Sequence, residues 1–591
     1  MLSFDDYFSD EALIREFCRL RAKLAKKRND ELFLHRISKD SRLSHSEGRA
    51  ANSWDIFPPR RLWHSYRPQE RGLRPSFDLN VQALSRATIE LREKTPTACW
   101  VQPLERKISA VRDRALARDG FSFGRPRIAA IEKNRKKHEY RPLALFSTED
   151  KIIDSITARY LRHALDVALT PSCLAFRCGK DGKQPPTIHD ALETILQMRT
   201  AHLDTDIFVA ECDIKAFFDC VSHEVAHAAL QDLIRDASAV NPKLRIDGRA
   251  LQIFDAYLNS YCFEQDANGQ GLLDLQHRVD KEGRFNWPWV ELRVLHGREI
   301  LPRIGVPQGG ALSCLVANAV LHVADKEMAR VSCDNSVPLT YLRYCDDMIL
   351  LSCDRTVCER AYKRYFDILL KLRLPAHPAR TVQQYSRSFW EGKSNAPYFW
   401  GPRKSSGIPW IQFVGYQIRY DGLVRVRPKS LKKHFQKLTS TADELLATLN
   451  PGHRTGDSPP PFAPGLRKSA KQILHRFRQK LISLSVGRIK LGKQVTGPMP
   501  MCWTNGFRGL LGKATMLSHL KGLDRHRERQ IQRVVRRIRT LHVAPSTNRA
   551  AKDVLQYYGS PFSYCAQFRP YTTRDAPTVR SPRALAASSG E

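Results

Sequence analysis

The sequence lacks any run of about 18 apolar residues, the length that a membrane-spanning helix requires. Its 14 cysteines form no Cys-x-x-Cys pair and no cysteine and histidine spacing typical of a zinc site. The first six residues lack the pattern of a secretory signal peptide. These absences predict a cytoplasmic protein with reduced structural thiols, without membrane spans or zinc fingers.

Acidic residues are scarce relative to basic ones. The chain has 61 Asp and Glu against 96 Lys and Arg, a formal net charge of +35 and a pI near 9.9. Solubility alone needs far less charge, whereas an excess of Lys and Arg binds polyanions by neutralising phosphates and releasing counterions. The composition therefore predicts a nucleic-acid partner. The length of 591 residues predicts about two to four modules.

Two adjacent acids stand between two apolar segments near the middle of the chain. Residues 339–344 and 348–351 have the pattern of two strands, and Cys345, Asp346 and Asp347 lie at the turn between them. An aspartate at a turn is also ordinary turn chemistry. Two carboxylates at the tip of a buried hairpin are costly, however, unless a cation neutralises them. A divalent metal is the natural partner, because hard cations prefer carboxylate oxygens.

A third acid follows another predicted strand. Residues 209–214 read as a short strand that carries Asp213 near its end, 133 residues before Asp346. If the two strands are neighbours in one sheet, the three carboxylates meet. Between them lies Gly305 to Ser313, whose proline and glycines let the backbone approach a ligand closely, followed by a predicted buried helix over 311–328.

The order of these segments resembles that of reverse transcriptases, in the bacterial lineage that includes group II intron proteins, retrons and defence-associated enzymes. The resemblance covers about residues 125–430. It departs from the usual pattern at Cys314, where proline is usual, and at Arg380, where lysine is common. Seven segments carry it, namely 131–133 with 141–143, 175–180, 213–219, 305–318, 343–347, 378–381 and 413–416.

The resemblance implies an α+β fold of the right-hand polymerase type, with fingers, an antiparallel-sheet palm, a helical thumb and an N-terminal extension. The expected modules are an extension over 1–110, fingers over 111–205, a palm over 206–428 with an insertion at about 235–300, a basic helical thumb or RNA-binding region over 429–574 and a disordered tail over 575–591. Within the thumb, residues 523–541 show helical periodicity with an arginine-rich face that favours nucleic acid over plain solvation. The arginines of this face are Arg525, Arg527, Arg529, Arg533, Arg536, Arg537 and Arg539.

The same resemblance assigns roles to single residues. Asp213, Asp346 and Asp347 are the expected catalytic residues, and with the backbone carbonyl of Ile214 they are the expected ligands of two Mg²⁺ ions, or of Mn²⁺. The nucleotide-binding residues are expected to be Lys133 and Arg141 at the triphosphate, Phe218 at the sugar 2′ position, Gln308 at the nucleotide and template, and Arg177 at the template or nucleotide. Asp219 and His223 are expected to be structural.

The partners implied are dNTPs, an RNA template (most simply a structured non-coding RNA) and a DNA product. No C-terminal endonuclease with cysteine pairs is visible. The long N-terminus, the enlarged palm and the basic C-terminal helices resemble those of stand-alone enzymes of the antiphage defence type, which we therefore expect. A group II intron maturase-like RNA-binding splicing factor is the alternative, and the sequence leaves a homo-oligomer open.

Overall fold

The computed structural model describes the greater part of the chain, in two compact units. One unit is built mainly from Phe77–Val414 with the N-terminal segment Met1–Lys27, and the other mainly from Gly415–Glu591. The described residues are 2–31, 55–66, 76–117, 120–134, 139–179, 185–203, 205–267, 284–285, 287–334, 337–381, 392–401, 410–449, 470–485, 510 and 516–540.

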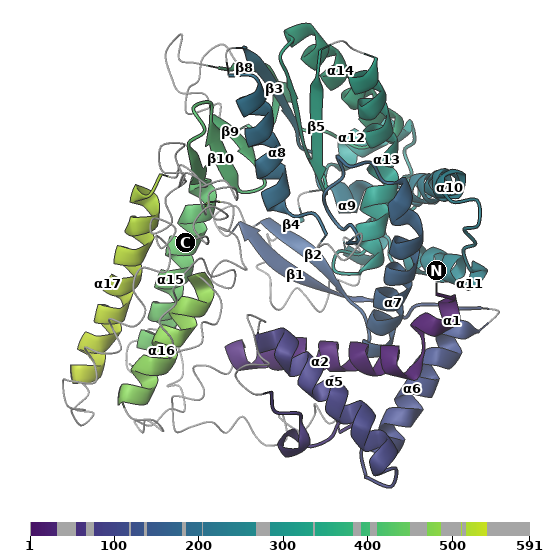
Figure 1. Ribbon diagram of the computed structural model, residues 1–591, viewed down its shortest axis with the longest axis vertical. Helices are drawn as coiled ribbons and strands as arrows, with labels where there is room; N and C mark the ends of the chain where they lie inside the picture. The colour runs from purple at the N-terminus through teal and green to yellow at the C-terminus, as the bar shows by residue number, and fades with distance from the viewer. Residues whose placement is uncertain are drawn as a thin grey trace, which may run out of the picture. The chain divides into compact units, whose positions relative to one another are not determined.

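The first unit contains a five-stranded sheet (Figure 1). All neighbouring strands are antiparallel except β8 and β7 at one edge. Five consecutive residues of β6, Met348 to Ser352, are buried, so that both faces of this strand are covered. In spatial order the strands are β5 (Leu339–Tyr344), β6 (Asp347–Ser352), β3 (Ile207–Cys212), β8 (Ser394–Trp400) and β7 (Ala379–Arg380).

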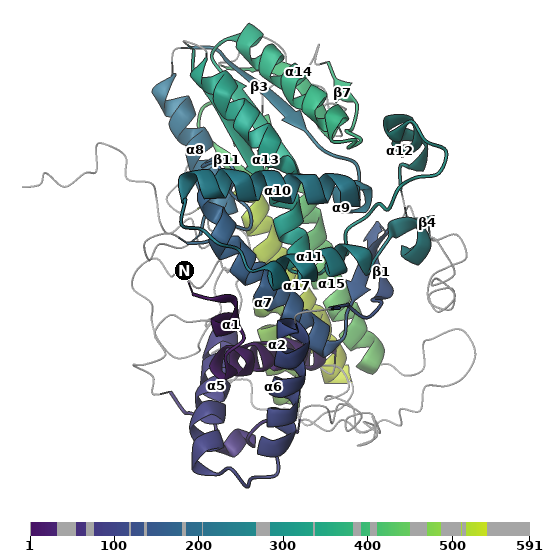
Figure 2. The same cartoon turned by 90° about the vertical axis from the view of Figure 1, so that its right-hand side faces the viewer.

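Two helices cover one face of this sheet. α14 (Arg355–Lys371) packs against β3, β6 and β8, and α13 (Leu312–Cys333) packs against β5 and α14 (Figures 1 and 2). α14 begins at the N-cap Asp354, whose side chain accepts bonds from two backbone amides of the first turn. α10 (His223–Val240) packs on the other side of α13.

A helical layer continues from α13. α7 (Thr148–Leu165) contacts α13, α10 and α11 (Gly248–Asn259), and on its other side it meets α6 (Val101–Leu116) and α1 (Phe4–Tyr7). The other α-helices that the structure describes in this unit are α2 (Asp10–Glu31), α5 (Ser76–Lys94), α8 (Ile188–Ala201), α9 (Phe217–Cys220) and α12 (Trp289–His296).

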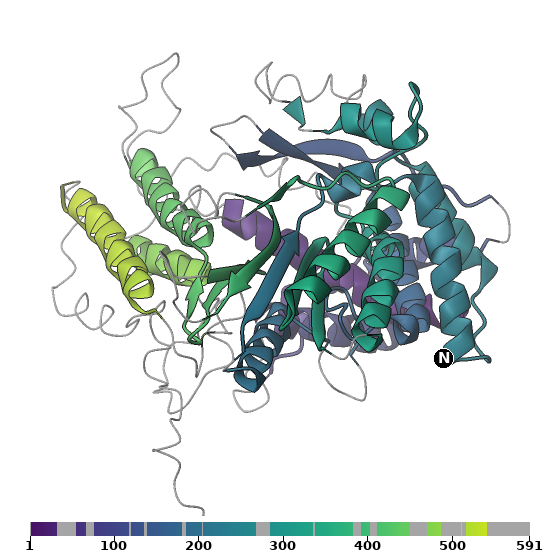
Figure 3. The same ribbon diagram turned by 90° about the horizontal axis from the view of Figure 1, so that it is seen from above.

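A separate antiparallel hairpin, β1 (Arg127–Asn134) and β2 (Glu139–Leu145), stands beside the large sheet (Figure 3). Strand β4 (Arg284–Phe285) adds to β2 in parallel. The predicted insertion at about 235–300 contains α11, a π-helical turn (Phe263–Ala267), β4 and α12. The first unit ends just after β9 (Trp410–Phe413).

The described part of the second unit contains a hairpin and three helices. β10 (Tyr416–Arg419) pairs with β11 (Val424–Val426), and α15 (Pro428–Leu449), α16 (Ala470–Ser485) and α17 (Ser518–Thr540) pack against one another. The apolar positions of α17 at i, i+3 and i+7, which are Ile531, Val534 and Ile538, are buried in this bundle.

The α+β class predicted from the sequence is confirmed, as are the strand before Asp213, the hairpin around Asp346 and the helices predicted over 311–328 and 523–541. The predicted tail over 575–591 lies outside the described residues. Among the described helices, none is long and apolar enough to cross a membrane.

Candidate active site

The turn between β5 and β6 presents two carboxylates. Tyr344 pairs with Asp347, so that Cys345 and Asp346 form the tip of the hairpin. Cys345 has φ of 63°, a left-handed conformation that residues with a Cβ rarely adopt. Asp346 is half-buried and Asp347 is exposed. The tight turn therefore places both acids at the same end of the sheet.

Asp213 reaches the same end of the sheet from β3. Cys212 pairs with Met348, so that the next residue of β3 lies beside the hairpin tip. Loss of hydration raises the pKa of Asp346, and the negative charge of Asp213 raises it further. The backbone of Asp213 is fixed by two bonds, from its amide to Ser394 Oγ at 3.0 Å and to its carbonyl from the amide of His377 at 2.9 Å. The predicted pairing of the two strands is therefore present, and Asp213 lies close enough to Asp346 to raise its pKa.

The carboxylate of Asp213 holds a cationic side chain that sequence reasoning missed. Lys393 Nζ lies 3.2 Å from Asp213 Oδ2 and 2.9 Å from His377 Nε2. Burial and, to a lesser degree, the ammonium of Lys393 together lower the pKa of His377 to about 4, so His377 is neutral at pH 7. No motif around Lys393 signals this contact, because it depends on how β8 aligns with β3.

The donor set at this end of the sheet suits a magnesium ion. Asp213 already attracts a cation, and the mutual repulsion of Asp213 and Asp346 favours one. Ile214 and Ala376 form an isolated β-bridge, whose two hydrogen bonds are accepted by the carbonyls of Asp213 and Pro375. The carbonyl of Ile214 takes no part in these two hydrogen bonds. Across the described residues, no three His, Cys, Asp or Glu side chains form a ready metal cluster. Mg²⁺ is commonly held by one or two carboxylates with water and substrate phosphates instead of a full protein cage, so these residues fit it.

Gln308 is bound to a buried acid. Its Nε2 donates to Asp219 Oδ1 at 2.7 Å, and its carbonyl accepts from the amide of Ala144 in β2 at 2.9 Å. Burial raises the pKa of Asp219 to about 7, although the hydrogen bond from Gln308 and the charges of Arg141 and Lys133 act to lower it. The structural role expected for Asp219 is that of orienting Gln308, which the sequence did not indicate.

The loop that carries Gln308 is held from several sides. The buried carboxylate of Asp154 in α7 accepts from the amides of Ala311 and Leu312 at 2.6 and 2.8 Å, which caps α13 from another helix. A Cβ at Gly310 would lie 1.8 Å from the hydroxyl of Tyr257, so only glycine fits there. The loop is therefore fixed where it passes Asp219.

The two predicted triphosphate ligands lie on the β1–β2 hairpin. Arg141 is exposed, and its positive charge lowers the pKa of both Asp219 and Asp346. Lys133 is also exposed and acts on Asp219 in the same direction. The structure thus brings both cations close to the acidic site, with Arg141 the one that also reaches Asp346.

Phe218 follows Asp213 in the chain and lies in the short helix α9. Ala216, with φ of 45°, turns the chain into this helix, and the carbonyl of Phe218 accepts from the amide of Val306 at 2.7 Å. The ring is half-buried and meets Phe217 edge to face at 5.2 Å. Phe218 is therefore partly available to a ligand beside the Gly305–Ser313 loop.

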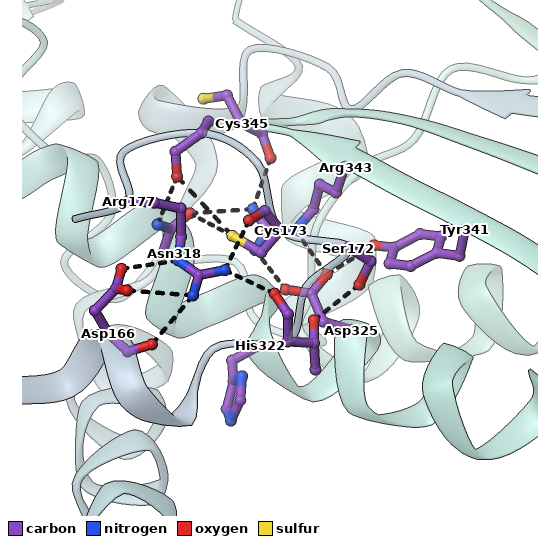
Figure 4. A network of polar contacts seen from close by, with 12 residues as sticks. Asp166, Ser172, Cys173, Arg177, Asn318, His322, Asp325, Tyr341, Arg343 and Cys345 are labelled. Carbon is purple, nitrogen blue, oxygen red and sulfur yellow. Dashed lines mark hydrogen bonds and ion pairs between the residues drawn. The ribbon is translucent and has the colours of Figure 1, made fainter. Parts of the chain in front are cut away.

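Arg177 differs from its predicted role. It is buried, and its guanidinium bonds both carboxylate oxygens of Asp166 and the carbonyls of Thr170 and Cys173 (Figure 4). A contact with template or nucleotide would require breaking these bonds, so the structure assigns Arg177 to loop packing. His223 begins α10 as expected, and its Nε2 lies 2.9 Å from the carbonyl of Gly305.

The predicted arginine-rich face of α17 is exposed only in part. Arg527 is buried and Arg537 is half-buried, whereas Arg525, Arg529 and Arg536 are exposed. Arg533 is exposed and bonds Asp443 of α15 at 2.8 Å. The exposed cations recur every three or four positions and form one cationic stripe along the helix, which consists of Lys521, Arg525, Arg529, Arg533 and Arg536.

Comparisons with known proteins give distant similarities. No protein-family model matches the chain, and no curated protein matches it. The chain is similar in structure to apo telomerase from Candida tropicalis, with a TM-score of 0.36, 11% identity and coverage of 95% of this chain and 88% of that one. Telomerase from Candida albicans, in complex with a TWJ fragment of telomeric RNA, gives a TM-score of 0.29, 12% identity and coverage of 84% and 76%.

A Candida tropicalis telomerase truncated from its C-terminal domain gives a TM-score of 0.30 and 12% identity over 50% of this chain, which spans 53% of that protein. Similarity this distant does not indicate an activity. The function is therefore inferred from the site.

Proposed function

We propose that this chain is an RNA-directed DNA polymerase, a nucleotidyltransferase that adds dNTPs to a 3′ hydroxyl. One observation carries the proposal, namely the meeting of Asp213 with Asp346 and Asp347 at one end of an antiparallel sheet. In this assignment the five-stranded sheet is the palm, the β1–β2 hairpin belongs to the fingers and α15–α17 form the thumb. Paired acids at such a position are suited to in-line attack at phosphorus.

Each residue of the site has a role in this proposal. Asp213, Asp346, Asp347 and the carbonyl of Ile214 would hold two Mg²⁺ ions, or Mn²⁺, which supply activation of the attacking hydroxyl and neutralisation of the leaving phosphate. Arg141 and Lys133 bind the triphosphate by charge. Phe218 crowds the sugar 2′ position, and Gln308, held by Asp219, contacts the nucleotide and its template partner.

The cationic stripe of α17 supports an RNA partner. Its exposed arginines can neutralise successive phosphates of a structured RNA. Together with the resemblance of the sequence to defence-associated enzymes, this favours a stand-alone cytoplasmic enzyme that copies an associated non-coding RNA into DNA in antiphage defence. A maturase-like splicing factor would use the same stripe without synthesis.

The test is DNA synthesis by purified protein on a primed RNA template with Mg²⁺ and dNTPs. Asp346→Ala with Asp347→Ala should reduce synthesis by at least about a hundredfold, because electrostatic stabilisation of this kind dominates such reactions. Folding should persist, since Asp347 is exposed and the charge of Asp346 is unfavourable in the folded state. Asp232→Ala, at an exposed acid of α10, is the matched control. Undiminished synthesis by the double variant would reject the proposal.

A further inference from the structure

A buried cation lies directly behind the acidic turn. Arg343 is the last residue before the Tyr344–Asp347 segment, and its side chain is 0% exposed, as is that of its partner Asp325 in α13. Burying two charges has a large desolvation cost, which is offset only when geometry and hydrogen bonding are nearly complete. The arrangement around Arg343 therefore requires an explanation beyond its charge.

The guanidinium of Arg343 is fully engaged (Figure 4). Nε donates to Asp325 Oδ1 at 2.7 Å, and Nη2 to Asp325 Oδ2 at 2.5 Å. Nη2 also donates to Cys173 Sγ at 3.0 Å, and Nη1 to Asn318 Oδ1 at 3.3 Å. The two-pronged bond to Asp325 fixes the plane of the guanidinium, as a lysine ammonium could not.

The remaining contact reaches the turn itself. Nη1 of Arg343 donates to the backbone carbonyl of Cys345 at 2.9 Å. This carbonyl belongs to the peptide group that continues into Asp346, and Cys345 is in the left-handed conformation, with φ of 63°. A residue with a Cβ adopts that conformation only when its surroundings hold it there. The bond from Arg343 supplies such a hold on the peptide that orients Asp346.

The strand that carries Arg343 is tied to a second segment. The amide of Arg343 donates to the carbonyl of Ser172, and the amide of Leu174 donates to the carbonyl of Arg343, both at 2.9 Å. Asn318 of α13 bonds the same loop through the carbonyl of Ala175 at 3.0 Å. The guanidinium is thus anchored to α13 and to the loop over 172–175, and only its Nη1 prong extends to the turn.

We propose that Arg343 is a positioning residue, which holds the Cys345–Asp346 peptide so that the carboxylates of the turn keep the orientation needed for synthesis. Asp325 acts behind it by fixing the guanidinium. The inference rests on the proposed function in one respect only, the use of this turn in synthesis. A purely structural ion pair would stabilise the fold without controlling the turn, and the two roles predict different behaviour.

The first test compares two substitutions that remove different bonds from the same network. Arg343→Lys keeps the charge but cannot bond Asp325 and Cys345 together. Tyr341→Phe is the matched control, because the hydroxyl of Tyr341 donates to the same Asp325 Oδ1 at 2.8 Å without contacting the turn. The measurements are amide hydrogen exchange of residues 344–347, with 349–351 of β6 as an internal reference, and the single-turnover rate of dNTP addition.

We expect Arg343→Lys to speed exchange at 344–347 relative to β6 by at least about tenfold, since local opening governs exchange, and to slow dNTP addition by a similar factor. In Tyr341→Phe both quantities should stay within about twofold. If exchange at the turn and the rate are unchanged in Arg343→Lys, the positioning role is wrong.

A triple variant tests the positioning role of Arg343 if Arg343→Lys does not fold. Arg343→Met, Asp325→Leu and Tyr341→Phe together replace the buried pair and its hydroxyl by apolar groups, a change that proteins often accept without loss of stability. We expect this variant to fold with a loosened turn and slow synthesis. Wild-type exchange at 344–347 and a wild-type rate would overturn the inference.

The exchange measurement separates this inference from the proposed function. A turn that loosens in the variants of a protein that makes no DNA would uphold the positioning role and reject the polymerase assignment. If the variants keep an unaltered turn and undiminished synthesis, the polymerase assignment is upheld and the positioning role is rejected.

Discussion

Replacing Asp219 by asparagine should change how the stability of the protein depends on pH. Asp219 is 7% exposed, and burial raises its pKa from 3.8 to about 7. Because the pKa is higher in the folded than in the unfolded state, the folded state binds the proton more tightly. The stabilisation is therefore fully present below about pH 4 and is lost as the pH rises through about 7.

The size of the effect follows from the two pKa values. A difference of one pKa unit corresponds to about 1.4 kcal/mol, so between pH 5 and pH 8 ionisation of Asp219 should remove roughly 2 to 3 kcal/mol from the free energy of unfolding. Asn cannot ionise, and its Oδ1 can still accept the bond from Gln308. As the pH rises from 5 to 8, the free energy of unfolding of Asp219→Asn should therefore increase by this amount relative to that of the wild type. Any cost of the amide that does not depend on pH leaves this change unaffected.

The assay is urea-induced unfolding at several pH values from 5 to 8, followed by far-UV circular dichroism. The quantity to compare is the difference between wild type and variant at each pH, because all other groups titrate alike in both. Asp354→Asn is the control: hydrogen bonds from Thr356 lower the pKa of Asp354, so its difference should not change in this range. A constant difference for Asp219→Asn would refute the burial argument.

Two further predictions concern substrates. Phe218→Ala should raise the incorporation of rNTPs relative to dNTPs in a competition assay, because it removes the bulk beside Gly305–Ser313 that is proposed to crowd a 2′ hydroxyl; an unchanged ratio would mean that another residue discriminates. Replacing Arg525, Arg529 and Arg536 by Gln should weaken binding of the copied RNA and reduce the magnitude of its log–log salt slope by about two to three, at roughly 0.7 to 0.9 per lost phosphate contact. Arg235→Gln, at an exposed arginine of α10, is the control, and an unchanged slope would show that the stripe of α17 is merely solvated.

The local elements of this protein were predictable because their patterns are short in range. Apolar segments predicted β3, β5, β6 and the buried helix α13, and helical periodicity predicted α17. The sequence predicted that Asp213 meets Asp346 if their strands are neighbours in one sheet, and β3 does pair with β6.

Predictions for single side chains were less successful where burial decides. Arg177 lies in a segment that resembles a polymerase motif, but its guanidinium forms a buried ion pair with Asp166. Arg527 belongs to the arginine-rich sequence of α17 but faces the helical bundle, because a stripe of exposed residues covers only part of a helix. Neither outcome can be obtained from spacing, since each depends on which surface another element covers.

The sequence by itself determined the charge of the protein, its strands and helices, and the identity of the acids that end two of those strands. Only the tertiary structure decided which polar groups support these acids. Asp219 meets Gln308 across 89 residues, and Asp154 caps α13 across 157. Arg343 and Asp325 are close in sequence, yet their bond forms because α13 packs against β5. Local propensity fixes where a strand or helix forms, whereas a buried polar group is stable only where packing brings it a partner.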